Sequence, residues 1–175
     1  MKRMLLVPVA VAVMLFGGAS AAQAQSEFRA SLSGANEVPA VATIAFGLAT
    51  FDVNFARSVL GIDFKLNVFN LGDAFMGHIH CAAVGVNGPI VAWLAGTPSA
   101  PPNASYELNG QWVSARLTQN SLIAGTMCGA NQINTLTDLI TLMANGNAYV
   151  NVHSRTNGGG EIRGQIAIVA PFTVP

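Results

Sequence analysis

Two histidines separated by one residue, His78 and His80, are the residues of this chain best suited to chemistry. The third and last histidine, His153, ends a second segment with strand character, 149–153. Residues two apart in a strand point to the same side, so His78 and His80 share one face. On the second segment, Asn151 and His153 share a face in the same way. If the two strands are neighbours, three imidazoles converge on one point.

Three neutral imidazoles suit Cu(II), Zn(II) or Ni(II), and a site with an open position accepts water or an anion. The Irving–Williams order and an exported setting favour copper, with zinc as the alternative metal. Met76 lies two residues before His78 and is predicted to offer a thioether on the same face, core packing being its alternative role. The alternative role of the histidines is to hold loops together through hydrogen bonds.

Three further residues are candidates for supporting roles. Asn151 and Glu161 are predicted to orient an imidazole through its second nitrogen, as partners of metal-bound histidines commonly do. Arg163 lies on the last predicted hairpin, where a salt bridge to Glu161 or a bond to loop carbonyls accounts for it. Glu37 is interpreted as a structural residue of its turn.

The first 24 residues predict a signal peptide. Lys2 and Arg3 precede the apolar run 4–16, and Ala22-Gln23-Ala24 is a small-residue cleavage site. The remaining residues, 25–175, suit a single β domain without a transmembrane segment. Removing Lys2 and Arg3 from the eight basic residues leaves six against eight acidic ones, a net charge of −2. With no basic patch, nucleic acid is excluded as a partner.

The two cysteines, Cys81 and Cys128, predict one disulfide bond, because an even count in an exported chain favours pairing. A pair of buried thiols is the alternative. The bond would close a loop of about 48 residues and add roughly 3–4 kcal/mol of stability. Since Cys81 follows His80 directly, it would also hold the histidine-bearing strand in place.

Hydrophobic alternation predicts many short strands and one helix, which indicates a mainly β fold, an antiparallel Greek-key-like sandwich or barrel. Apolar residues at helical spacing place the helix at Thr135 to Asn145. A turn at Asn70-Leu71-Gly72-Asp73 is predicted to lead into the histidine strand. The predicted strands are 27–32, 43–55, 62–68, the histidine segment, 88–94, 112–117, 149–153 and 161–169.

Four motifs in order resemble a known family. They are the run 32–39, the pair His78-Ile79-His80 with 85–89, the segment 146–153 and the segment 160–165. Together they look like a CHRD (chordin-type) domain over about Glu27 to Ile168. The resemblance implies an extracellular or periplasmic β-rich domain. In animals such domains occur in a secreted protein that sequesters growth factors, and in bacteria they usually stand alone.

A second resemblance concerns chemistry. Copper/zinc superoxide dismutases carry a His-x-His on one strand, another copper-ligand His on a Val-rich strand, and a disulfide cysteine. An Arg near their C-terminus guides an anion to copper, and Arg163 matches it in order. A fourth, bridging His and a zinc-loop cluster have no counterpart here. The resemblance therefore implies that an enzyme with this sequence would be a copper-only dismutase, and a binuclear site is not expected.

Two hypotheses follow. The first is an exported or periplasmic copper-binding protein that serves copper storage, delivery or protection. Weak superoxide chemistry is a variant of this hypothesis, but a protein that is not an enzyme is the preferred interpretation. The second is a non-catalytic secreted interaction or matrix module without metal, whose partner is another exported protein or a second copy. A homodimer would also complete a three-histidine site with groups from its second subunit.

Overall fold

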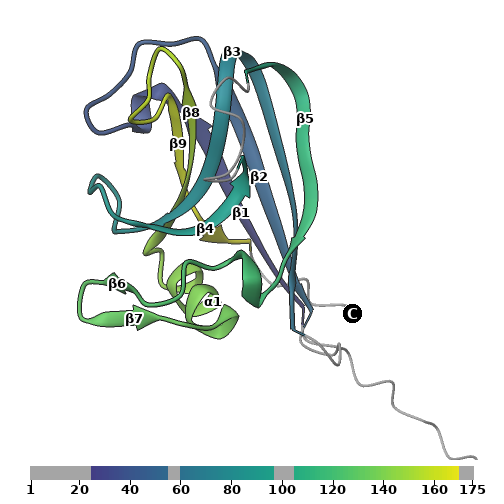
Figure 1. The fold of residues 1–175 in the computed structure, drawn as a ribbon, viewed down its shortest axis with the longest axis vertical. Helices are drawn as coiled ribbons and strands as arrows, with labels where there is room; N and C mark the ends of the chain where they lie inside the picture. The colour runs from purple at the N-terminus through teal and green to yellow at the C-terminus, as the bar shows by residue number, and fades with distance from the viewer. Residues whose placement is uncertain (1–24, 55–59, 97–104, 170–175) are drawn as a thin grey trace, which may run out of the picture.

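A closed antiparallel barrel forms the centre of the computed structural model, which describes residues 25–54, 60–96 and 105–169. The predicted signal peptide, 1–24, lies outside the described residues. Hydrogen-bonded neighbours follow the order β1-β2-β3-β8-β9, and β9 returns to β1 at Ser33 and Arg163 (Figure 1). These strands are β1 (Gln25–Ser33), β2 (Phe46–Asn54), β3 (Ile62–Cys81), β8 (Ala148–Ser154) and β9 (Ile162–Gln165). The predicted mainly β, antiparallel fold is confirmed.

Further elements surround this barrel. Two strands pair with the second edge of β3, and a short one, β10, pairs with β1. A two-stranded sheet, β6-β7, and two 3-10 turns complete the fold. The bounds are β4 (Ile90–Ala95), β5 (Tyr106–Leu117), β6 (Thr126–Cys128), β7 (Asn131–Ile133), β10 (Ala167–Ile168), η1 (Gly34–Asn36) and η2 (Gln119–Ser121).

Strand β3 runs for 20 residues and carries both the barrel wall and the histidine pair. Its first half pairs with β2 and β5, and its second half pairs with β8 and β4. The predicted turn at 70–73 is therefore wrong. Asn70 and Asp73 adopt φ values of 54° and 53°, and the register against β5 shifts there. Asn and Asp tolerate this left-handed conformation, so the strand bends through irregular pairing and continues.

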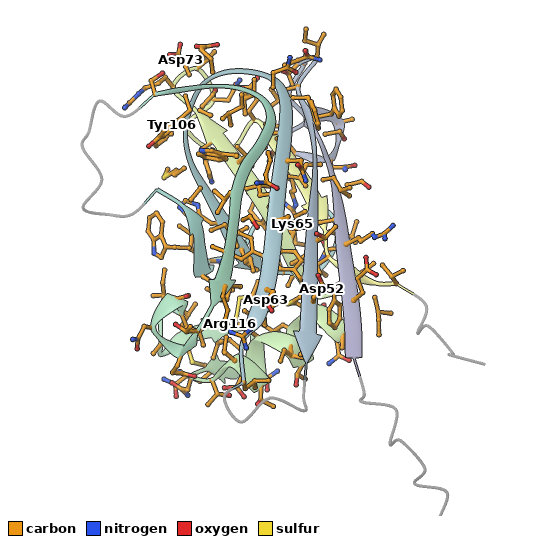
Figure 2. The ribbon with its side chains drawn as sticks, turned by 90° about the vertical axis from the view of Figure 1, so that its right-hand side faces the viewer. Asp52, Asp63, Lys65, Asp73, Tyr106 and Arg116 are labelled. Carbon is orange, nitrogen blue, oxygen red and sulfur yellow. A yellow bond between two sulfur atoms is a disulfide. The ribbon has the colours of Figure 1, made fainter. Side chains whose placement is uncertain are left out.

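The core lies inside the barrel, where alternate residues of neighbouring strands meet. Phe51, Phe64 and Val150 are each at most 4% exposed. Polar side chains lie on the outer face of β3 and β5, as Figure 2 shows for Asp63, Lys65 and Arg116. Arg116 donates two hydrogen bonds of 2.9 Å to the Asp63 carboxylate across β5 and β3. As the predicted period-two alternation requires, successive side chains of these strands point in turn into the core and toward the surface.

The helix is α1 (Leu136–Ala144), within the predicted range. Thr135 caps its start: the Thr135 hydroxyl oxygen accepts from the backbone N–H of Asp138, and the Asp138 carboxylate accepts from the backbone N–H of Thr135. This capping box satisfies two N–H groups at the start of the helix. Gly146, with φ 66°, follows the helix end. Leu139 and Met143 are fully buried, so the apolar stripe is core, as predicted.

The predicted disulfide between Cys81 and Cys128 is present. It joins the end of β3 to the β6-β7 hairpin, which the sequence did not predict. Strands of three residues leave too few positions for alternation to be recognised. Within the described residues, none of the helices has both the length and the apolar character needed to span a membrane.

Candidate metal centre

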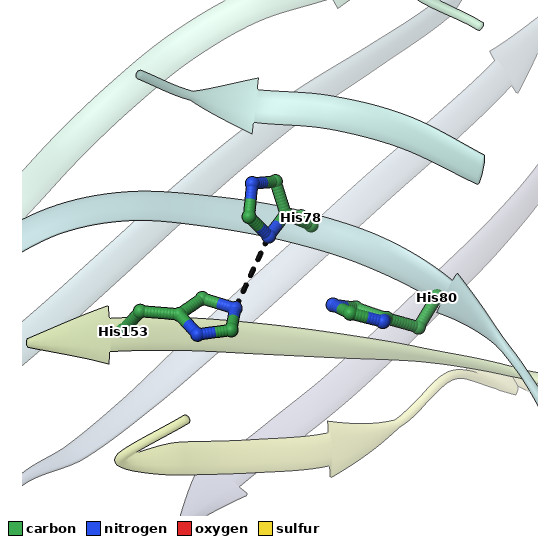
Figure 3. A group of neighbouring side chains, drawn as sticks. All are labelled: His78, His80 and His153. Atoms are coloured by element: carbon green, nitrogen blue, oxygen red, sulfur yellow. Dashed lines mark hydrogen bonds between the residues drawn. The ribbon is translucent and has the colours of Figure 1, made fainter. Parts of the chain in front are cut away.

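His78, His80 and His153 form one buried cluster on the β3-β8 ladder. Each offers one ring nitrogen, and these atoms lie within 4.8 Å of one another. The side chains are 0%, 8% and 5% exposed, in that order. In the ladder, Met76 pairs with His153 and His78 pairs with Asn151, so antiparallel pairing brings the third histidine beside the first two. The predicted convergence of the three imidazoles is therefore present (Figure 3).

The cluster lies on the outer side of the barrel wall, beneath loops. Ile79, between the two histidines, is fully buried in the barrel core, so the histidines point the opposite way. Carbonyl groups of the loop 82–89 and of the β8-β9 turn bond to their rings. Alternation alone predicts that the histidine-bearing face of β3 and β8 is exposed to solvent, but these loops cover that face and bury the histidines.

Two of the imidazoles are fixed in one tautomer by backbone carbonyls. Nδ1 of His80 lies 2.9 Å from the Gly88 carbonyl oxygen, and Nδ1 of His153 lies 3.1 Å from that of Gly158. A carbonyl oxygen only accepts, so both Nδ1 atoms carry the proton and both Nε2 atoms carry a lone pair. In Figure 3, the free nitrogen of His80 points toward the other two rings. This carbonyl anchoring is typical of metal-ligating histidines.

The remaining pair of nitrogens faces each other directly. Nδ1 of His78 lies 3.1 Å from Nε2 of His153. Because that Nε2 carries a lone pair, Nδ1 of His78 donates, and the lone pair of His78 is on Nε2. The Nε2 atoms of His78 and His80 are buried without a hydrogen-bond partner among the described residues. Metal–nitrogen bonds of 2.0–2.1 Å place nitrogens about 3.4 Å apart in a tetrahedral site, and the three candidate nitrogens lie within 4.8 Å of one another. Nδ1 of His78 becomes a ligand once its proton moves to Nε2 of the same ring.

All three rings are held uncharged at neutral pH. Burial lowers the pKa of His78 to about 3, with further lowering by His153 and His80. Burial likewise lowers the pKa of His153 to about 4, against the bond to the Gly158 carbonyl. Burial and then, in part, Arg163 lower the pKa of His80, against the bond to Gly88. The lone pairs are therefore not taken by protons from water.

Aromatic rings line the cluster. The Trp93 ring meets His78 edge-on at 4.3 Å between centroids, and Tyr149 stacks on His80 at 4.9 Å and 11°. Phe75 contacts His153 at 6.3 Å. These walls exclude water and provide few polar atoms, so the ring nitrogens dominate the chemistry of the site.

Arg163 holds the loop that carries Gly88. Its guanidinium is 2% exposed, lies 3.4 Å from the Tyr149 ring centroid, and donates to Asn87 Oδ1 at 3.1 Å. It also donates to the carbonyls of Val86, at 2.8 Å, and Ala83, at 3.4 Å. Of its two predicted bonding patterns, the bond to loop carbonyls is observed.

Glu161 accepts a 2.8 Å hydrogen bond from Thr43 Oγ1. It supplies no hydrogen bond to an imidazole among the described residues. The orienting groups are instead the carbonyls of Gly88 and Gly158, which sequence reasoning missed. The glycine-rich turns that follow His80 and His153 were the available signal. An anion-guiding role for Arg163 and ligation by Met76, which is half-buried opposite His153, stay predictions.

Asn151 connects the cluster to a carboxyl group that the sequence assigned only to a turn. Its Nδ2 lies 3.5 Å from Oε2 of Glu37. Burial raises the pKa of Glu37 to about 7, although Arg163 and Asn151 oppose the shift. Glu37 Oε1 and Asn151 Oδ1 are buried without partners among the described residues. No pattern around Glu37 in the sequence indicated this position.

Comparison with known proteins gives one match. The family model described as the CHRD domain matches residues 28–166. No curated protein and no solved structure matches the chain. The match covers β1 from Phe28 onward, the whole of β2, β3, β8 and β9, and all three histidines.

Proposed function

The chain belongs to the CHRD domain family, and on that premise we propose that it is an exported protein that binds one copper ion through His78, His80 and His153. The family and the disulfide support an extracellular module. Within the proposal, residues 1–24 are a signal peptide removed on export, and residues 25–175 form a single domain in the periplasm or the medium.

One observation supports this proposal most directly. Nδ1–H of His80 and Nδ1–H of His153 each donate to a backbone carbonyl, so the Nε2 atom of each ring carries the lone pair that can bind a metal. A histidine that only holds a loop needs no buried, unpartnered second nitrogen, and each such atom costs about 1–3 kcal/mol. Here the Nε2 atom of His80 lacks a partner. A metal ion held by Nε2 of His80, Nε2 of His153 and Nδ1 of His78 would satisfy it.

Copper is the proposed metal because imidazole donors bind it most tightly among the divalent first-row ions. Zinc is the alternative. The proposed roles are copper storage, delivery or protection, with weak superoxide chemistry at a copper-only site as a variant. The buried cluster supports holding an ion more than rapid exchange with substrates, since its rings are at most 8% exposed.

A metal-free interaction module is the second candidate. Apolar side chains on the outer surface favour it, since Ile44, Phe46 and Leu48 are 82%, 48% and 38% exposed. Phe46 stacks on Phe69 at 5.0 Å between centroids, which gives this surface an ordered aromatic pair. Its partner would be another exported protein or a second copy of the chain.

The test is a copper titration of metal-stripped protein, residues 25–175, at pH 7, under oxidising and under reducing conditions. We expect one copper per chain, lost in His78→Ala, His80→Ala and His153→Ala. Trp112→Ala, at a half-buried position of β5, is the matched control and should keep the ion. Binding that is no tighter than that of an unrelated protein in both conditions would reject the metal site and favour the interaction module.

A further inference from the structure

We infer that the three-histidine centre prefers copper as Cu(I) over Cu(II), an inference that rests on the proposed function and adds the oxidation state. The reason is the charge of the site. Three neutral imidazoles converge in a buried position beside a fixed guanidinium, with no anionic ligand in the cluster.

The ligand set supplies no negative charge. Among the described histidines, cysteines and acidic residues, the group that could share an ion consists of His78, His80 and His153 alone. The neighbouring Cys81 is committed to its disulfide and offers no thiolate. Transferring an ion from water into a buried site costs more for a doubly charged ion than for a singly charged one. A neutral donor set leaves that difference uncompensated.

The nearest fixed charge is positive. The Arg163 guanidinium lies 3.4 Å from the centroid of Tyr149, whose ring is 4.9 Å from that of His80. The cation is therefore within roughly 8 Å of the His80 ring. The ion would lie about 3 Å from the centre of the His80 ring and so within roughly 11 Å of the guanidinium. At that separation and an effective dielectric constant of about 20, one additional positive charge on the ion weakens binding on the order of tenfold. Arginine remains protonated throughout the accessible pH range.

Carboxyl groups near the centre compensate little of this charge. Glu37 bonds to Asn151, opposite His78, and its burial leaves it only partly ionised at neutral pH. Glu161, which follows the β8-β9 turn, accepts from Thr43 and does not belong to the group of side chains that could share an ion with the histidines.

Coordination preference acts in the same direction. Cu(II) favours tetragonal surroundings with nitrogen and oxygen ligands. The rings of Trp93 and Tyr149 pack against those of His78 and His80, and no fourth histidine, cysteine or acidic side chain of the described residues joins the group of ligands. Met76, opposite His153 in the ladder, is the neighbour able to add a donor, and thioethers select Cu(I).

The experiment compares two affinities of the metal-stripped protein, residues 25–175. Cu(I) is titrated without oxygen against a Cu(I)-specific chelator, and Cu(II) against an amino-carboxylate chelator. We expect Cu(I) to bind at least about tenfold more tightly. Each tenfold of preference raises the reduction potential of the bound ion by about 59 mV, which protein-film voltammetry checks independently. Equal affinities, or tighter Cu(II), would overturn the inference while leaving the copper site intact.

A paired variant tests the charge argument itself. Asn151→Asp combined with Glu37→Gln keeps the number of carboxyl groups and the amide–carboxyl pair, but moves the carboxyl group to the position opposite His78. We expect the Cu(I) preference to fall by about thirtyfold or more. The single variant Glu37→Gln, which removes negative charge, should not lower it. An unchanged ratio in the paired variant would contradict the charge argument. Failure of wild-type protein to bind copper in either state would reject the proposed function as well.

Discussion

Nδ1 of His78 and Nε2 of His153 are 3.1 Å apart, a separation that one proton bridges and that two lone pairs facing each other would not maintain. Nδ1–H of His153 donates to the Gly158 carbonyl, so Nε2 of His153 carries a lone pair and the bridging proton belongs to Nδ1 of His78. An ion that takes Nδ1 of His78 must therefore move the proton to Nε2 of the same ring. The proton stays on the protein, because all three rings are already neutral.

We accordingly predict that copper binding at pH 7 releases almost no protons and switches His78 from the Nδ1–H to the Nε2–H tautomer. Nitrogen-15 NMR of the metal-free and Cu(I)-loaded protein reports the tautomers of all three rings. Calorimetry in buffers of different ionisation enthalpy counts the protons. Release of about one proton per ion would contradict the assignment, since it would require a charged imidazole in the metal-free state.

Glu37→Gln is predicted to stabilise the metal-free protein at pH 8 and to change its stability little at pH 5. The folded-state pKa of Glu37 is raised to about 7, so the protonated carboxyl is favoured by folding and this contribution is lost as pH rises from 4.5 through 7. The glutamine amide can also donate to Asn151 Oδ1, which lacks a partner. We expect a gain on the order of 1 kcal/mol at pH 8 by urea unfolding. An equal gain at both pH values would assign the effect to packing.

Acid is predicted to destabilise the metal-free protein between pH 6.5 and about 3. The pKa values of His78 and His153 are lowered to about 3 and 4, so the unfolded chain binds more protons than the folded one in this range. Stability is then full above pH 6.5 and falls with acidification. The experiment uses the Glu37→Gln variant as its starting protein, because protonation of Glu37 would stabilise the folded state as the pH falls and would oppose the effect of the histidines. Replacing His78 by Gln should flatten the slope, and an unaltered slope would assign acid sensitivity to other groups.

Gly88→Ala is predicted to weaken copper binding by about 10- to 100-fold. A Cβ at this position would overlap the Cys81 carbonyl, so the loop must shift and its carbonyl would leave Nδ1 of His80. Gly159→Ala is the matched control, because a Cβ there has open space around it. Chelator competition on both variants, with the His80 tautomer read by NMR, separates loss of anchoring from general unfolding. Wild-type affinity in Gly88→Ala would show that the anchor is dispensable.

Arg163→Met is predicted to cost about 2–4 kcal/mol of stability and to release the loop 82–89. The side chain is buried and its donors reach three acceptors in that loop. Arg116→Met is the control, since its ion pair with Asp63 lies on the half-exposed outer face and should contribute at most about 1 kcal/mol (Figure 2). Similar unfolding free energies for the two variants would argue against a structural role of Arg163.

The sequence carried enough information for the barrel, the helix and the histidine faces, because each depends on local periodicity and capping. His78 and His80 share a face by alternation, and Thr135 caps the helix by its own side chain. The uninterrupted course of β3 through Asn70 and Asp73 depends on pairing with strands distant in sequence, which no local pattern encodes. The same holds for the position of Glu37, since its burial and its contact with Asn151 arise only when loops fold over the sheet.

The distance along the chain between the histidines also sets when the centre can form. His78 and His153 are 75 residues apart and meet only through the β3-β8 ladder. Pairing across such a separation carries a large loop-closure cost and belongs to the late stages of folding. In a chain that is still unfolded, His78 and His80 are close in sequence but the third donor, His153, is not yet beside them. For the proposed function, this order means that the ion would be bound tightly only once the barrel is complete, so that metal-loaded protein would be fully folded protein.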